Sequence, residues 1–328
     1  MSHLLEVKDL TTAFSADYGE TVSVDHISFH VDEGETVCIV GESGCGKSVT
    51  SLSIMGLLGR GGAVKDGSAL FAGKNLLELT EKELDELRGN RIAMIFQDPL
   101  TSLNPVFTVG NQITESIRTH MNVSKEEARE RAIQVLAKVG MPDPAGTMKK
   151  YPHTLSGGMR QRVMIAMALS CDPDLLIADE PTTALDVTIQ AQIMALLKQL
   201  RDESKMSMIL ITHDIGLVAR MADRVIVMYA GQLVEEAPVK ELFASPCHPY
   251  TRALLATIPS IYDEKDRVLE SIPGIVPENY DKITGCRFAD RCPYRRPECD
   301  QPQHDMIVNE RHKAKCWRAK EVNGSLVP

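Results

Sequence analysis

The chain has 328 residues, of which 43% are hydrophobic and 25% are charged, as is ordinary for a globular protein. Its formal net charge of −9 argues against a protein that binds nucleic acid through its overall electrostatic field. No window approaches about 18 consecutive apolar residues, and residues 1–10 lack the basic and apolar regions of a secretory signal. We therefore expect a cytosolic chain whose eight cysteines are thiols or metal ligands rather than disulfides.

The first part of the chain combines alternating and continuous apolar segments. Residues 4–10 and 22–31 alternate apolar and polar side chains, which predicts half-buried strands. The apolar run 37–40 predicts a buried strand, and the glycine-rich segment 41–48 follows it directly. Apolar residues then recur at helical spacing from Val49 onwards. The order strand, glycine loop, helix is the context in which a phosphate-binding loop occurs.

Segment 41–48 fits the pattern G-x-x-x-x-G-K-[ST] and is called the P-loop below. Glycines let backbone N–H groups converge on phosphate oxygens, and the helix N-terminus adds positive potential. We expect the Lys47 ammonium to reach the β- and γ-phosphates of ATP and the Ser48 hydroxyl to bind Mg²⁺. The nucleotide-binding residues predicted around this loop are Gly41, Ser43, Gly44, Cys45, Gly46, Lys47, Ser48 and Val49.

The segments that follow predict an α/β fold. Buried strands are predicted at 92–96, 175–178 and 208–211, helices at 109–140 and 187–202, and a hairpin at 225–228 and 233–235. Strands that alternate with helices favour a parallel sheet with helices on both faces. Ligands of such sheets bind beyond the carboxyl ends of the strands.

Four polar residues follow these predicted strands directly, namely Gln97, Asp179, Glu180 and His213. Asp179 is placed to orient Mg²⁺ through water, and Glu180 to polarise the water that attacks the γ-phosphate. His213 is placed to sense the γ-phosphate. Each residue alone is better explained as a solvated polar side chain at a strand end. Their combination with a P-loop predicts nucleotide hydrolysis, with Glu180, His213 and Gln97 as the catalytic set.

Residues 4–245 resemble the nucleotide-binding subunits of ABC transporters. The segment Leu155-Ser156-Gly157-Gly158-Met159 is similar to the signature loop of that family, in which Gln is usual at the position of Met159. We expect this departure to alter the rate and to preserve the function. The other matching segments are Gln97 for the Q-loop, Asp179-Glu180 for the Walker B end, Ala184-Leu185-Asp186 for the D-loop, His213 for the switch histidine and Tyr18 for the adenine-stacking aromatic.

The resemblance implies an architecture and an ATP site shared between subunits. The fold implied is a P-loop NTPase with a RecA-like core sheet, an N-terminal antiparallel β part and a helical subdomain inserted at about 98–170. In the family, two ATPase subunits close around two ATP molecules. Ser156, Gly157 and Gly158 then contact the ATP of the partner subunit, and Asp186 belongs to the same nucleotide site. Gln97 joins Ser48 and Asp179 as a Mg²⁺ ligand and transmits the closure to membrane partners.

Two stretches narrow the resemblance to importers of dipeptides and oligopeptides, namely 96–105 and 246–255. They imply an ATPase domain at 1–245 and a C-terminal extension at 246–328. The implied protein lies on the cytoplasmic face of the bacterial inner membrane. Its implied partners are a second, paralogous ATPase subunit, two transmembrane permease subunits and, indirectly, an extracytoplasmic peptide-binding protein, without nucleic acid. Import of nickel or another small solute, a non-transport ABC ATPase and a redox-regulated binding module remain alternatives.

The extension has few apolar runs and carries four cysteines, Cys286, Cys292, Cys299 and Cys316. Four cysteines in such an irregular segment suggest a metal site that stabilises the structure of the segment. Their spacing lacks the C-x₂-C pattern of zinc ribbons, and the nearby arginines offset the negative charge of a thiolate-ligated cluster. A structural [4Fe–4S] cluster is the first hypothesis. A Zn²⁺ ion and unligated thiols remain open.

Overall fold

The computed structural model describes residues 3–16, 19–97, 102–183, 185–258 and 272–322. Tyr18, Ala184 and segment 98–101, which the sequence analysis singled out, lie outside these ranges. The chain divides into two compact parts. Unit 1 comprises Met1–Val31, Thr36–Leu77 and Thr212–Pro328, and unit 2 comprises Asp32–Glu35 and Glu78–Ile211. In the described part of the chain, no helix has both the length and the apolar character needed to cross a membrane.

Unit 1 begins with an antiparallel sheet in the strand order β2-β1-β4-β5. Its strands are β1 (Leu5–Ala16), β2 (Gly19–Val31), β4 (Gly62–Phe71) and β5 (Lys74–Asn75). Val7 on β1 lies opposite Phe29 on β2 and Ala69 on β4, and all three side chains are buried. The alternating pattern of residues 4–10 and 22–31 therefore marks one buried face, and the two predicted strands are confirmed.

A second set of strands in unit 1 pairs in the order β11-β12-β10-β9-β3. These strands are β3 (Thr36–Val40), β9 (Arg224–Tyr229), β10 (Gln232–Pro238), β11 (Met306–Asn309) and β12 (His312–Ala314). β3 pairs in parallel with β9, and β9 and β10 form the predicted hairpin around Ala230 and Gly231. Because β12 pairs with β10, the C-terminal segment extends this sheet.

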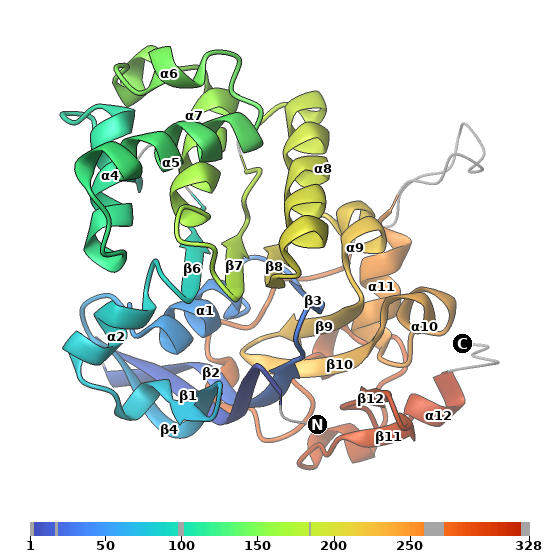
Figure 1. Cartoon of the computed structure of the whole chain (residues 1–328). Coiled ribbons are helices and arrows are strands. Elements are labelled where there is room, and N and C mark those ends of the chain that lie inside the picture. The colour runs from blue at the N-terminus through green and yellow to red at the C-terminus, as the bar shows by residue number, and fades with distance from the viewer. Residues whose placement is uncertain (1–2, 17–18, 98–101, 184, 259–271, 323–328) are drawn as a thin grey trace. The chain divides into compact units, whose positions relative to one another are not determined.

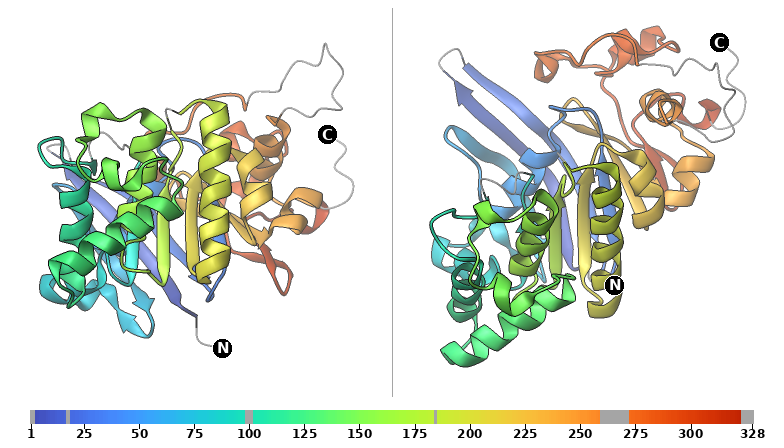
Figure 2. Two further views of the ribbon diagram at one scale, coloured as in Figure 1. Left: turned by 45° about the horizontal axis from the view of Figure 1, so that its top comes forward. Right: turned by 90° about the horizontal axis from the view of Figure 1, so that it is seen from above.

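In both views of Figure 2, the orange and red C-terminal segments lie beside the yellow strands β9 and β10. The helices of unit 1 are α1 (Lys47–Met55), α9 (Ile215–Met221), α10 (Val239–Ala244), α11 (Pro249–Ala256) and α12 (Ala319–Val322). The segment after Pro246 lacks long apolar runs, yet it buries Tyr250 and Phe288 completely against Tyr229. Aromatic side chains supply the apolar area that the sequence pattern did not reveal.

A buried carboxylate holds the C-terminal segment on β10. Glu235 accepts hydrogen bonds from the backbone N–H groups of Cys247 and His248, at 2.7 and 2.8 Å. The Nε2 atom of His312 on β12 lies 2.7 Å from the same carboxylate. A buried charge is tolerated only when its hydrogen-bonding capacity is met, so Glu235 fixes both ends of this segment on one strand.

Unit 2 contains a parallel set of strands in the order β8-β7-β6. These are β6 (Ile92–Ile95), β7 (Leu175–Asp179) and β8 (Ser207–Thr212), whose side chains are almost all buried. The helices are α2 (Glu81–Leu87), α4 (Val109–His120), α5 (Lys125–Lys138), α6 (Pro144–Thr147), α7 (Gly157–Ala168) and α8 (Val187–Ser204). The three predicted buried strands are thus confirmed.

The green helices α4, α5, α6 and α7 form one group in Figure 1, and they pack on one another. The single helical pattern predicted at 109–140 is two helices. The chain breaks between them because Ser124 caps α5, accepting the N–H of Glu127 while Glu127 accepts the N–H of Ser124. This reciprocal pair is a capping box, which a Ser followed three residues later by a Glu indicates in a sequence.

The buried His248 makes the stability of the protein sensitive to acid. Burial lowers the pKa of its imidazole to about 4, against the opposing effect of Glu235. The unfolded chain takes up this proton near pH 6.5 and the folded chain only near pH 4, so stability falls as the pH falls through that window.

We expect His248 alone to lower the unfolding free energy by up to about 1.4 kcal/mol per pH unit below about pH 6.5. In His248→Asn, which retains an acceptor for the Tyr250 N–H, urea denaturation at pH 7 and pH 5 will show a smaller loss than in the wild type. Equal losses in the two proteins would contradict this role for His248.

Candidate functional site

The P-loop joins β3 to α1, and glycine is required at its end. Gly46 caps α1 with a φ of 101°, which L side chains rarely adopt. A Cβ atom at this position would lie 2.7 Å from the backbone oxygen of Ser23. Gly44 also has a positive φ, of 78°, but a Cβ atom there would meet nothing within 4 Å. The backbone therefore approaches β2 closely at Gly46 and is open at Gly44.

The Lys47 ammonium lies within the curve of the P-loop and is only 5% exposed. Its Nζ donates hydrogen bonds to the backbone oxygens of Gly41 and Glu42, at 2.9 and 3.0 Å. The Sγ atom of Cys45 lies 3.8 Å away, and burial raises the pKa of that thiol. The loop thus holds one positive charge at the N-terminus of α1, where an anion is stabilised.

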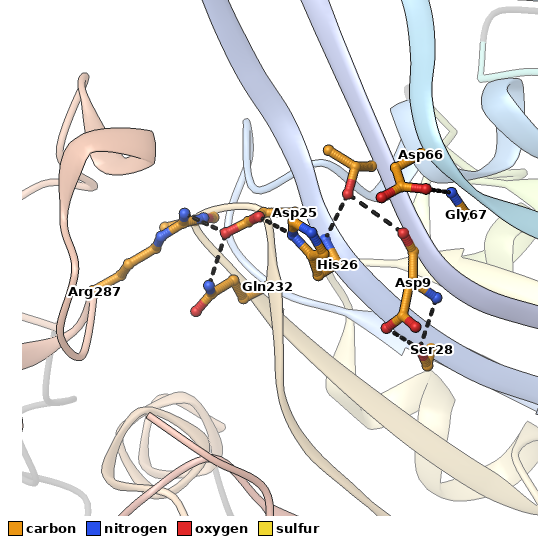
Figure 3. A network of polar contacts seen from close by, with 10 residues as sticks. Asp9, Asp25, His26, Ser28, Asp66, Gly67, Gln232 and Arg287 are labelled. Carbon is orange, nitrogen blue, oxygen red and sulfur yellow. Dashed lines mark hydrogen bonds and ion pairs between the residues drawn. The ribbon is translucent and has the colours of Figure 1, made fainter. Parts of the chain in front are cut away.

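A polar network ties the P-loop to neighbouring strands of unit 1. Gly231, in the β9–β10 turn, donates its N–H to the Cys45 oxygen and accepts the N–H of Asp25. In Figure 3, Arg287 and Gln232 reach the Asp25 carboxylate from one side and His26 from the other. Burial raises the pKa of Asp25. Hydrogen bonds from His26 and Gln232 and the charge of Arg287 lower it by more, so the pKa lies below its ordinary value and this carboxylate stays ionised.

Sequence reasoning missed the contacts that the C-terminal segment makes with the P-loop. The Glu42 N–H donates to the Tyr250 hydroxyl at 2.8 Å, and the Arg291 guanidinium binds both carboxylate oxygens of Glu42. Glu42 occupies a variable position of the P-loop pattern, so the pattern carries no information about its partners. The clustering of arginines around the cysteines was the only available signal.

The predicted catalytic residues Gln97 and Glu180 meet in unit 2. The Gln97 Nε2 atom donates to Oε2 of Glu180 at 3.1 Å, and the Thr183 hydroxyl donates to the same oxygen at 2.9 Å. Glu180 has a φ of 46°, which turns the chain sharply after Asp179, the buried last residue of β7. Thr183 was not predicted from the sequence, and it orients the carboxylate together with Gln97.

Two helix N-termini lie together at the predicted signature loop. The Ser156 hydroxyl caps α7 by accepting the Met159 N–H at 3.4 Å, and Asp186 caps α8 by accepting the Ile189 N–H at 2.9 Å. A Cβ atom at Gly158 would lie 2.9 Å from Cγ2 of Ile189, so glycine permits this approach. The free N–H groups of both first turns give this surface a positive potential.

The predicted site residues divide between the two units. The P-loop and His213, which is exposed at the end of β8, belong to unit 1. Gln97, Asp179, Glu180, Asp186 and the loop Ser156-Gly157-Gly158 belong to unit 2. Each unit thus carries part of the predicted catalytic set.

The four cysteines of the extension line a single small cavity, together with His248, Phe288 and neighbouring residues. Burial raises the pKa of Cys286 to about 12 and that of Cys316 to about 11, so as free thiols both are neutral at pH 7. Among the described residues, no three of these sulfurs lie within 4.8 Å of one another. A tetrahedral Zn²⁺ site requires sulfurs about 3.8 Å apart, because each Zn–S bond is about 2.3 Å.

Gly44 and Gly46 allow a matched comparison of the stability of two alanine variants. We expect Gly46→Ala to lower the unfolding free energy by about 3 kcal/mol, through the strained φ and the contact with the Ser23 backbone. Gly44→Ala carries only the strain and is expected to cost about 1 kcal/mol. Urea denaturation of the two variants measures both values. Equal destabilisation would mean that the close approach at Gly46 does not limit the side chain.

Known protein families match both the first and the last part of the sequence. The ABC transporter family model matches residues 24–183, and the model of the C-terminal region of oligopeptide/dipeptide transporters matches residues 234–299. The chain is 54% identical to the oligopeptide transport ATP-binding protein AppD of Bacillus subtilis, over 94% of each chain. It is 51% identical to the dipeptide transport ATP-binding protein DppD of Escherichia coli, over 95% of this chain and 96% of that protein.

Among solved structures, the chain resembles the ATP-binding cassette MJ0796 in a dimeric post-hydrolysis state bound to ADP and Pi. The TM-score is 0.65 at 29% identity, over 72% of this chain and 98% of that one. A similar match, with a TM-score of 0.63 at 30% identity, is to CbiO1 from Clostridium perfringens, part of the transporter complex CbiONQ. It covers 74% of this chain and 92% of that one.

Proposed function

The chain belongs to the ATP-binding proteins of ABC transporters, in the oligopeptide/dipeptide branch, and on this premise we propose that it powers the import of dipeptides and other short peptides across a bacterial inner membrane. The predicted ABC ATPase fold and the ATPase activity are confirmed. The observation that supports peptide import most strongly is identity of 51–54% to peptide transport ATP-binding proteins over nearly the whole length of both chains.

ATP and Mg²⁺ are the ligands expected of such an ATPase. In our proposal the P-loop amides and Lys47 bind the phosphates, and Ser48, Gln97 and Asp179 hold Mg²⁺. Glu180 accepts the proton of the attacking water, in an orientation set by Gln97 and Thr183. His213 contacts the γ-phosphate and Tyr18 stacks on the adenine.

We further propose that the nucleotide is sandwiched between two ATPase subunits. The paired N-termini of α7 and α8, at Ser156 and Asp186, form an anion-binding surface that suits the phosphates of a nucleotide held by a partner. In this proposal the partner is a paralogue, and both bind the cytoplasmic side of two permease subunits that receive peptide from an extracytoplasmic binding protein. The loop after Gln97 transmits nucleotide-driven closure to the permeases.

Replacing the proposed general base separates binding from hydrolysis. In the assembled transporter, we expect Glu180→Gln to retain ATP binding and to lower turnover at this subunit by about 100-fold or more, because the amide cannot accept the proton. Glu203→Gln, an exposed change on α8, is the matched control and should hydrolyse ATP as the wild type does. Phosphate release measures turnover. Wild-type turnover in Glu180→Gln would remove Glu180 from this role.

A second proposal concerns the four cysteines. A [4Fe–4S] cluster binds each thiolate to a different iron and so holds the sulfurs further apart than a single Zn²⁺ ion does. All four cysteines line one cavity, which supports a single metal site shared by the four thiolates. Such a cluster would cross-link a segment that has little apolar core of its own.

Metal analysis of anaerobically purified protein tests this assignment. We expect about four iron atoms per chain and a broad visible absorption that bleaches on reduction. In Cys299→Ser the iron content should fall, whereas replacement of Cys171, which belongs to unit 2, should leave it unchanged. Colourless protein with about one zinc atom per chain, or with no metal, would contradict the cluster.

A further inference from the structure

Every polar group of Glu42, the second residue of the P-loop, has a partner within unit 1. Its N–H donates to the Tyr250 hydroxyl at 2.8 Å, and its backbone oxygen accepts from Lys47 Nζ at 3.0 Å. Its carboxylate accepts from both terminal nitrogens of Arg291, at 2.7 and 3.0 Å. Two of these three partners come from the C-terminal extension. The same residue that helps to hold the phosphate-binding lysine is therefore held by the extension.

The partners of Glu42 are themselves rigidly placed. Arg291 is 5% exposed, and its Nε donates to the Pro273 oxygen at 2.8 Å. Its guanidinium lies 5.7 and 5.8 Å from the ring centres of Tyr229 and Phe288. The hydrogen bond to Glu42 raises the pKa of Arg291 above its ordinary value, so the guanidinium remains charged. Tyr250 is fully buried and packs on Tyr229, with ring centres 4.6 Å apart.

The charges of Glu42 and Arg291 determine how their contact affects the binding of an anionic ligand. Glu42 is the one carboxylate within the P-loop, and an unpaired carboxylate there would repel a triphosphate. A bidentate arginine both offsets the charge and fixes the carboxylate in one orientation. A lysine would supply the charge without the fixed geometry.

We propose that Arg291 is a positioning residue for the ATP site, which neutralises Glu42 and holds the P-loop in its phosphate-binding conformation. This inference rests on the proposed binding of ATP at the P-loop. It makes the extension a determinant of nucleotide affinity, because Arg291 contributes through Glu42 and touches no nucleotide itself. Arg287 supports the same loop indirectly, since it donates to the Ala230 oxygen next to Gly231, whose N–H donates to the Cys45 oxygen.

Titration of the full-length chain with a fluorescent ATP analogue and Mg²⁺ tests the proposal. We expect Arg291→Ala to weaken binding about tenfold, because Glu42 is left as an uncompensated negative charge beside the phosphates. Arg291→Lys should lie between Arg291→Ala and the wild type. The matched control is Arg295→Ala, since Arg295 belongs to the same extension and forms its ion pairs with the exposed Asp290 and Asp300.

The double variant distinguishes a charge effect from general damage to the loop. In Glu42→Ala/Arg291→Ala the repulsion is absent, so ATP affinity should return to within about threefold of the wild type. In the assembled transporter, Arg291→Lys should raise the KM for ATP and leave kcat nearly unchanged. This more conservative variant also carries the test if Arg291→Ala does not fold.

Wild-type affinity in Arg291→Ala would overturn the proposal, and so would a double variant in which affinity does not recover. Failure of the proposed function is distinguishable, because the wild-type chain itself would then bind no ATP. An affinity loss in Arg295→Ala equal to that in Arg291→Ala would also overturn it, since the effect would then belong to the extension as a whole.

Discussion

A phosphate-binding loop works only if its backbone N–H groups point towards the phosphate site and are not bonded to other groups of the protein. The P-loop meets this constraint because its other polar groups already have partners. The Lys47 ammonium binds the oxygens of Gly41 and Glu42, and the Cys45 oxygen accepts the N–H of Gly231. These contacts fix the loop before any ligand arrives, so that little conformational entropy is lost on binding.

The same logic applies to the proposed catalytic residues of unit 2. Glu180 occupies a strained backbone conformation, and its carboxylate is held by Gln97 and Thr183. Strain of this kind persists where surrounding contacts over-determine it, as at catalytic positions. At the signature loop, Ser156 and Asp186 cap two adjacent helices and leave further N–H groups available. Fixed donors, rather than mobile side chains, thus dominate the surfaces that we propose to bind nucleotide.

Much of this arrangement was predictable because its signals are local. The P-loop, the strand ends at Gln97 and Asp179, and the capping box at Ser124 each lie within a short segment of sequence. The contact between Arg291 and Glu42 joins residues 249 positions apart, and that between Gln97 and Glu180 joins residues 83 apart. No periodicity or motif encodes such pairs. The sequence of the extension did not reveal a hydrophobic core for the same reason, since its buried aromatic residues pack on strands that are distant in the sequence.

Peptide uptake by reconstituted vesicles tests the central claim most directly. The vesicles would contain this chain, the proposed paralogous ATPase and the proposed permease subunits, with a peptide-binding protein outside and ATP on the side of the ATPase subunits. The account predicts uptake of a labelled dipeptide that requires ATP and stops when this chain is omitted. Binding-protein-dependent uptake that proceeds without this chain, or ATP turnover that peptide-loaded binding protein does not raise, would contradict it.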